Sequence, residues 1–167
     1  MSKPVILCID DQREVLAALT KDLEPFNPHF DLVEAESAED AGAVLDELVA
    51  RGTPVALIIS DHVMPGTNGV DFLASLRGRD ALRHTGKLLL TGLATHEDTI
   101  RAINQAAIDR YIAKPWHADE LERNVSELVT YFVLATYPDD YRRFLPVLSQ
   151  DVMLDAMQQG PGPHGDR

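Results

Sequence analysis

Hydrophobic runs recur along the chain, and each is bounded by turn or capping residues. Five runs are short and rich in Val, Ile and Leu: Val5–Ile9, Phe30–Ala35, Val55–Ser60, Lys87–Thr91 and Arg110–Ala113. The third and fourth are continuously apolar rather than alternating, which is typical of strands that are buried on both faces. The pattern therefore predicts five strands of a parallel sheet.

Stretches with helical periodicity separate these runs. They cover Gln12–Leu23, a segment that begins at Ser37, Gly69–Arg77, a segment that begins at Thr95, and His117–Tyr137. The tetrapeptides that start at Ser37 and Thr95 resemble capping boxes. Five strands alternating with five helices predict an α/β fold, a doubly wound five-stranded parallel sheet with helices on both faces.

The sequence changes character after Pro138. Apolar residues recur as far as Leu154, which predicts further helical structure, and Gly160–Pro163 then marks a flexible end. We predict a domain over residues 1–136, a helical extension or connector over residues 137–159, and a flexible tail over residues 160–167.

Charge and cysteine content narrow the class of protein. The formal net charge is −12, and no stripe of Lys and Arg offsets it, so direct nucleic-acid binding is not expected. The one cysteine, Cys8, lies in an apolar run and favours a buried residue of an intracellular protein. Neither a signal peptide nor a run of about 18 apolar residues is present, so we expect a cytoplasmic protein without a membrane span.

Reactive side chains follow four of the predicted strands. Asp10 and Asp11 follow the first, Asp61 the third, Thr91 ends the fourth, and Lys114 follows the fifth. Because the carboxyl ends of parallel strands share one edge of the sheet, these side chains are expected to share one cleft. Three carboxylates crowded together favour a divalent cation, and oxygen ligands select Mg²⁺ or Mn²⁺. An aspartate beside such a metal is suited to attack phosphorus and form an aspartyl phosphate.

These residues, together with the segments Ser60–Gly69 and Tyr111–Trp116, closely resemble the receiver domain of bacterial two-component response regulators over residues 3–135. The resemblance implies a flavodoxin-like sheet with strand order 2-1-3-4-5. It also implies a signalling switch that accepts a phosphoryl group from a sensor histidine kinase or phosphotransfer protein. Such a chain is not an enzyme on other substrates, since it acts only on its own aspartate.

The resemblance assigns a role to each site position. Asp61 would be the phosphoacceptor and a metal ligand, Asp11 would bind the metal directly, and Asp10 would bind it mainly through water. The backbone carbonyl of Val63 would complete the protein ligands. Lys114 would pair with Asp61 or its phosphate.

A second group of positions would transmit the signal. Thr91 would move inward on phosphorylation, and the ring of Tyr111 would turn inward with it. The partner or dimer surface would then cover residues 95–137, or the C-terminal extension. Three apolar residues beyond what the sheet needs, Tyr131, Phe132 and Leu134, favour a dimer contact or the start of a connector.

Some positions depart from the common pattern of the family. Val63 and Leu93 are both apolar and cannot orient a hydrolytic water, so we predict slow self-dephosphorylation. His62, which follows the acceptor, is expected to be an exposed structural residue. The helix before the fifth strand ends at Ala107 without the expected glycine.

Two other functions fit these residues less well than the switch does. A phosphohydrolase of the haloacid-dehalogenase type needs an Asp-x-Asp motif, whereas Asp10 and Asp11 are adjacent here. A pseudo-receiver that serves only for docking or dimerisation predicts an eroded site, yet every site position is filled. The switch is therefore favoured, and the pseudo-receiver stays the alternative.

Overall fold

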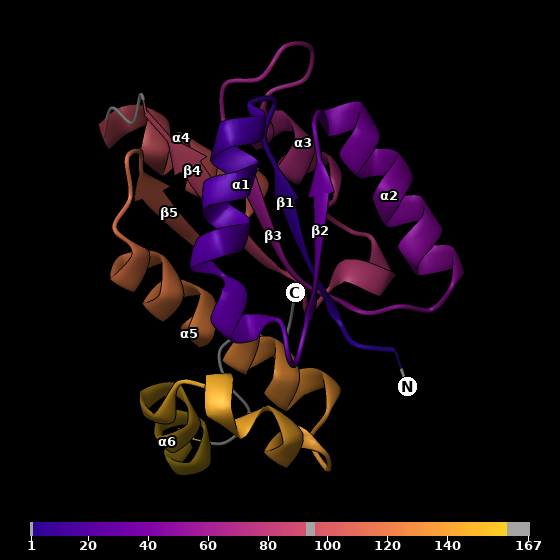
Figure 1. Ribbon diagram of the computed structural model, residues 1–167, viewed down its shortest axis with the longest axis vertical. Coiled ribbons are helices and arrows are strands. Elements are labelled where there is room, and N and C mark those ends of the chain that lie inside the picture. Colours follow the sequence, from indigo (N-terminus) through magenta and orange to yellow (C-terminus); the bar gives the residue numbers. More distant parts are fainter. Residues whose placement is uncertain (1, 93–95, 160–167) are drawn as a thin grey trace.

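The computed structural model describes residues 2–92 and 96–159, although the side chains at 96, 98, 99, 102 and 103 lie outside the description. Its centre is a five-stranded sheet in the order β2-β1-β3-β4-β5, in which every neighbouring pair is parallel (Figure 1). The strands are β1 Val5–Ile9, β2 Asp31–Ala35, β3 Val55–Asp61, β4 Gly86–Thr91 and β5 Arg110–Ala113. The predicted fold class and strand order are confirmed.

Helices alternate with the strands as predicted. The α-helices are α1 Arg13–Asp22, α2 Ala38–Ala50, α3 Gly69–Ser75, α4 His96–Ala106, α5 Ala118–Thr136 and α6 Gln150–Gln159. Short 3₁₀ helices are η1 Glu24–Phe26, η2 Asp80–Leu82 and η3 Tyr141–Val147. None of the described helices is long and apolar enough to span a membrane.

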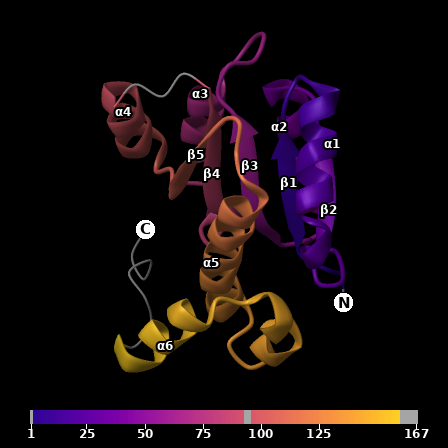
Figure 2. The same cartoon turned by 60° about the vertical axis from the view of Figure 1, so that its left-hand side comes forward.

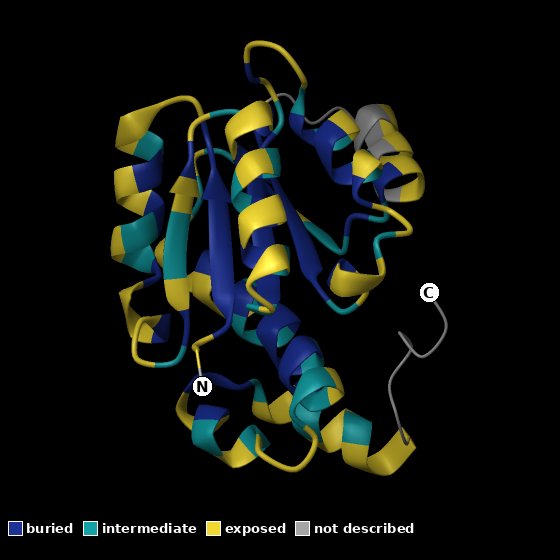
Figure 3. Cartoon of the chain, turned by 90° about the vertical axis from the view of Figure 1, so that its right-hand side faces the viewer, coloured by how far each residue is buried: buried dark blue, intermediate teal, exposed yellow. Residues whose placement is uncertain are grey.

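The sheet divides the core into two layers because alternate residues of a strand point to opposite faces. In β1, Ile6 and Cys8 pack with α1 and α5, whereas Leu7 and Ile9 pack with α2 and α3. The strands at the centre are accordingly buried between helices (Figure 3). Burial raises the pKa of the Cys8 thiol to about 12, so this cysteine is a protonated core residue.

Local signals explain several helix ends. The Ser37 side chain accepts a hydrogen bond from the backbone N–H of Asp40 and thus caps α2, as predicted. The matching prediction at Thr95 lies outside the described residues. At the end of α4, Ala107 takes the left-handed conformation, with φ of 51°, where a glycine is the usual residue.

The C-terminal extension packs against the end of α5, below the sheet in Figure 2. Phe144 is fully buried, and its ring contacts those of Phe30 and Tyr137. Phe132 of α5 is buried against Tyr137 as well. Within the described residues, the extension therefore covers Phe132, one of the three surplus apolar residues of α5, without a second chain.

Candidate functional site

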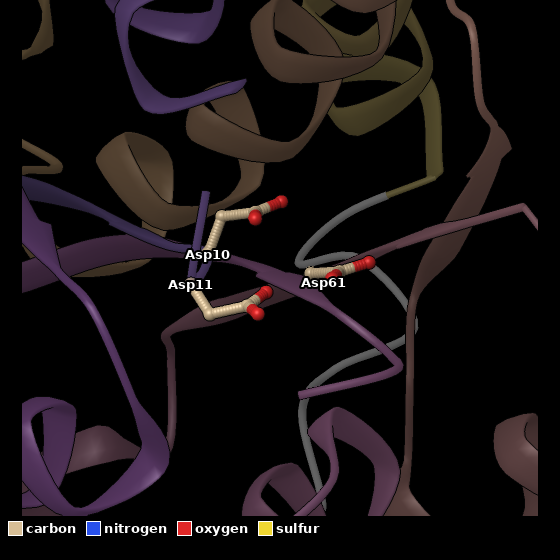
Figure 4. A group of neighbouring side chains, drawn as sticks. All are labelled: Asp10, Asp11 and Asp61. Atoms are coloured by element: carbon tan, nitrogen blue, oxygen red, sulfur yellow. The ribbon is translucent and has the colours of Figure 1, made fainter. Parts of the chain in front are cut away.

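Three aspartates meet at the carboxyl ends of the neighbouring strands β1 and β3 (Figure 4). One carboxylate oxygen from each of Asp10, Asp11 and Asp61 lies within 4.8 Å of the others. Asp10 is fully buried and Asp61 is 7% exposed, whereas Asp11 is exposed to solvent. The sequence prediction that these side chains share one cleft agrees with this geometry.

The ammonium of Lys114 lies between two of these carboxylates. Its Nζ is 2.9 Å from Oδ2 of Asp10 and 2.8 Å from Oδ1 of Asp61. Lys114 directly follows β5, and its backbone N–H donates to the carbonyl of Thr91 at 2.9 Å. The bond from Lys114 to Pro115 is cis. The lysine therefore joins the ends of β1, β3, β4 and β5.

Burial and the neighbouring charges shift the pKa values of both Asp61 and Lys114. Burial raises the pKa of Asp61 above its ordinary value; Lys114 opposes this shift, and the neighbouring Asp10 adds to it. For Lys114, burial alone would lower the pKa, but the carboxylates of Asp61 and Asp10 outweigh burial and raise it. Asp61 is thus a carboxylate of raised basicity held beside an ammonium that stays protonated.

The loop after β3 holds the Asp61 backbone tightly. The Ser60 hydroxyl donates to the Asp61 carbonyl at 2.9 Å, and the N–H of Gly69 donates to the His62 carbonyl at 2.8 Å. A Cβ atom at Gly69 would overlap the Asp61 carbonyl oxygen, so only glycine fits there. Gly66, in the same loop, has a φ of 81°, which favours glycine as well.

One oxygen of Asp61 carries both of its hydrogen bonds. Oδ1 accepts from Lys114 and from the backbone N–H of His62, the latter at 2.9 Å. Among the described residues, Oδ2 has no recorded partner. In Asp10, by contrast, Oδ1 accepts from the N–H of Gln12 and Oδ2 from Lys114.

The predicted switch residues sit on adjacent strands but differ in exposure. Thr91 ends β4 and is 4% exposed, whereas Tyr111 of β5 is 45% exposed, so the tyrosine ring points outward in this state. Val63 is 58% exposed beside the cleft. Leu93, the other residue of the dephosphorylation argument, lies outside the described residues.

Two contacts and the burial of one side chain at the site are not predicted by the sequence. Lys114 reaches Asp10 as well as Asp61. The indole N–H of Trp116 donates to the carboxylate of Asp22 at 2.9 Å, which ties the segment after Lys114 to α1. His62 is half-buried instead of exposed, and its Nδ1 atom is buried without a hydrogen-bond partner among the described residues. No residue-type pattern in the sequence marks these long-range contacts.

A family comparison decides the class of this site. Residues 6–126 match the response regulator receiver domain. The chain belongs to this family. A receiver domain works in the phosphorylation-dependent signalling of two-component systems, so the resemblance drawn from the sequence is confirmed.

Individual proteins with similar sequences support this family assignment. This receiver domain is 33% identical over 124 residues to the hydrogenase transcriptional regulatory protein HoxA of Cupriavidus necator, which covers 74% of this chain and 24% of HoxA. It is 30% identical over 126 residues to the chemotaxis protein CheY-3 of Vibrio cholerae, 74% of this chain and 89% of that protein. This chain thus spans about a quarter of HoxA and most of CheY-3.

A solved structure is similar in fold as well. The signal receiver domain of an HD domain-containing protein from Pseudomonas fluorescens Pf-5 superposes with a TM-score of 0.67 at 29% identity. The match covers 79% of this chain and 90% of that one.

Proposed function

We propose that this receiver domain accepts a phosphoryl group on Asp61, in a reaction that depends on Mg²⁺. A sensor histidine kinase or a phosphotransfer protein would be the donor. The observation that carries the proposal is the pairing of Asp61 with Lys114 beside Asp10 and Asp11. Crowded carboxylates, a basic aspartate and a fixed ammonium are what transfer of a charged phosphoryl group requires.

The donor atoms of the cleft fit a hard divalent cation. All the candidate ligands are oxygens, which suits Mg²⁺ or Mn²⁺. Asp11 is exposed and Asp61 contributes Oδ2, whereas both oxygens of Asp10 already accept hydrogen bonds. Asp11, Asp61 and the Val63 carbonyl would thus bind the ion directly, and Asp10 through water. When bound, the ion would neutralise charge on the transferring phosphoryl oxygens.

The two oxygens of Asp61 would take different roles. With Oδ2 on the ion, Oδ1, which accepts from Lys114 and the His62 N–H in the free state, would form the new bond to phosphorus. The bond from phosphorus to the donor histidine nitrogen breaks, and that nitrogen keeps the electron pair. Lys114 stays protonated and pairs with the phosphoryl oxygens, while the Thr91 hydroxyl would donate to one of them.

The output would be a change in surface rather than in fold. Movement of Thr91 toward the phosphoryl group would open space for the exposed ring of Tyr111 to turn inward. Ile100 of α4 is 47% exposed beside this region, so Ile100 and Tyr111 would offer apolar contacts on the surface of α4, β5 and α5 to a partner or a second copy. Phosphorylation would shift the population between two arrangements of this face. We place the switch in the cytoplasm, as expected of a partner of histidine kinases.

Intact-mass analysis tests the proposal. The full chain is incubated with acetyl phosphate and MgCl₂, and wild type should gain about 80 Da, the mass of one phosphoryl group. The gain should disappear with EDTA and in Asp61→Asn, and should persist in the surface control Asp71→Asn. An unmodified wild type would instead support a pseudo-receiver that acts only by docking.

The lifetime of the phosphoryl group is a separate prediction. Val63 offers no polar side chain to orient water at the cleft, so the acyl phosphate should decay slowly. Val63→Asn should shorten its lifetime. Fast loss from wild type, unchanged by that substitution, would contradict the argument.

A further inference from the structure

A pocket of about 590 Å³ lies at the end of the sheet opposite Asp61. It is bounded by the residues after α3, by η2, by the start of β4 and by the end of α4. The helices α3 and α4 lie side by side (Figure 2). Its volume is within the usual range for small-molecule sites. None of the residues proposed for phosphoryl transfer lines it.

The pocket is basic in a strongly acidic chain. Arg77, Arg79, Arg83 and Lys87 line it, and Asp80 is the one acidic residue in the lining. These four cations are among 15 in a chain whose formal net charge is −12, and they fall within eleven residues. Such a local concentration of positive charge attracts anions against the overall field of the protein.

Two of the arginines can change partner at little cost. Arg79 pairs with Asp46 at 3.1 Å and Arg83 with Asp80 at 3.6 Å, but these carboxylates are 73% and 92% exposed. Exposed ion pairs contribute only about 0–1 kcal/mol. A phosphate offers the guanidinium groups two oxygens each and more charge, so it would compete successfully for both arginines.

The other two cations of the pocket, Arg77 and Lys87, contact the end of α4. Arg77 donates to the carbonyl of Gln105 at 3.0 Å, and Lys87 donates to the carbonyl of Ala106 at 3.3 Å. Ala107 then turns the chain with its positive φ. An anion in the pocket would share these donors with the last turn of α4.

We propose that this pocket binds a phosphorylated small molecule of nucleotide size. The guanidinium groups of Arg79 and Arg83 bind its phosphates. The side chains of Leu76 and Leu82 form an apolar wall against the part of the molecule that carries no phosphate. Binding alters the last turn of α4 through Arg77 and Lys87. Since the pocket lies away from Asp61, binding does not require phosphorylation.

Calorimetric titration of the full chain with pyrophosphate and with ADP, in EDTA, tests the proposal. The double variant Arg79→Gln/Arg83→Gln should weaken binding of both probes by at least about tenfold, because two charge-assisted contacts are lost. The control Arg51→Gln removes an exposed arginine directly after α2 that pairs with Glu47 outside the pocket lining, and should bind as wild type does. Asp61→Asn should also bind normally.

Comparison of the two probes separates the sources of affinity. ADP should bind more tightly than pyrophosphate, because Leu76 and Leu82 contact the nucleoside. Equal affinities would show that the phosphates alone are recognised and would contradict a ligand of nucleotide size. ADP should also change amide hydrogen exchange in the last turn of α4 in wild type but not in the double variant. No binding at about 5 mM probe, or binding that survives the double substitution, overturns the proposal. Loss of binding in Asp61→Asn would assign the anion to the other cleft and overturn it as well.

Discussion

Replacement of Lys114 by methionine tests how much the ion pairs with Asp10 and Asp61 contribute to the stability of the fold. Lys114→Met keeps most of the aliphatic volume but leaves the carboxylates of Asp10 and Asp61 without the ammonium between them. Asp10 is fully buried and Asp61 nearly so, so water screens their repulsion poorly. We expect the folded state to lose stability.

The distances set the size of the effect. At 2.9 and 2.8 Å, each ion pair corresponds to about 6 kcal/mol of attraction at an effective dielectric constant of about 20. The cost of burying the ammonium offsets most of this attraction. Removal of one partner of a buried pair costs about 3–5 kcal/mol, and the lower end applies because the Lys114 side chain is 22% exposed. About 3 kcal/mol corresponds to a fall in Tm of roughly 6–12 °C for a chain of this size.

Urea denaturation of wild type and Lys114→Met at neutral pH, without a divalent cation, measures this loss. Lys21→Met, at an exposed lysine of α1, is the control and should change stability by less than about 0.5 kcal/mol. Saturating MgCl₂ should stabilise Lys114→Met more than wild type, because the cation supplies the missing positive charge. A loss below about 1 kcal/mol, as for a surface salt bridge, would refute the reasoning.

Four further predictions follow from individual contacts. Burial raises the pKa of Asp61 in the folded state, so the folded state loses stability as pH rises from about 4 through the folded pKa. Asp61→Asn should therefore be more stable than wild type at neutral pH. Urea melts should show this difference shrinking on acidification. Gly69→Ala should abolish the phosphoryl adduct in mass spectra, because the new methyl group displaces the Asp61 backbone. Phe144→Ala should cost about 3–5 kcal/mol in urea melts, whereas the exposed Leu145→Ala should cost under about 0.5 kcal/mol. Ala107→Gly should raise stability by about 0.5–1 kcal/mol, because glycine adopts positive φ freely.

Each of these four has a contrary result. A constant difference between Asp61→Asn and wild type across the acid range would show that burial does not perturb the aspartate. A normal adduct in Gly69→Ala would show that the loop can move. Equal losses for Phe144→Ala and Leu145→Ala would show that the extension is not docked, and a destabilised Ala107→Gly would show that the cap is not strained.

The sequence predicts the fold because strong local signals agree with the topology. Continuously apolar runs such as Val55–Ser60 are buried on both faces, and parallel pairing brings their carboxyl ends to one edge. This geometry places Asp10, Asp11 and Asp61 together before any contact is known. Small differences arise at element ends, where β3 extends to Asp61 and β2 begins after Phe30, whose ring packs into the core.

What the sequence does not predict depends on contacts between distant residues. Lys114 and Asp10 are 104 positions apart, and only the folded backbone shows that the ammonium reaches both carboxylates. The burial of Phe144 against Phe30 and Tyr137 has the same origin, because a short apolar segment carries no information about which surface it covers. The basic pocket also arises only when the ends of α3 and α4 meet.

Chemical location of the phosphoryl group tests the central claim most directly. Borohydride reduces an acyl phosphate to an alcohol, so treatment of the phosphorylated chain converts the modified aspartate to homoserine, which peptide mass spectrometry identifies. The account predicts homoserine at position 61 and at no other aspartate, and only in samples that contained Mg²⁺. Homoserine at Asp10 or Asp11, or its formation without a divalent cation, would contradict it.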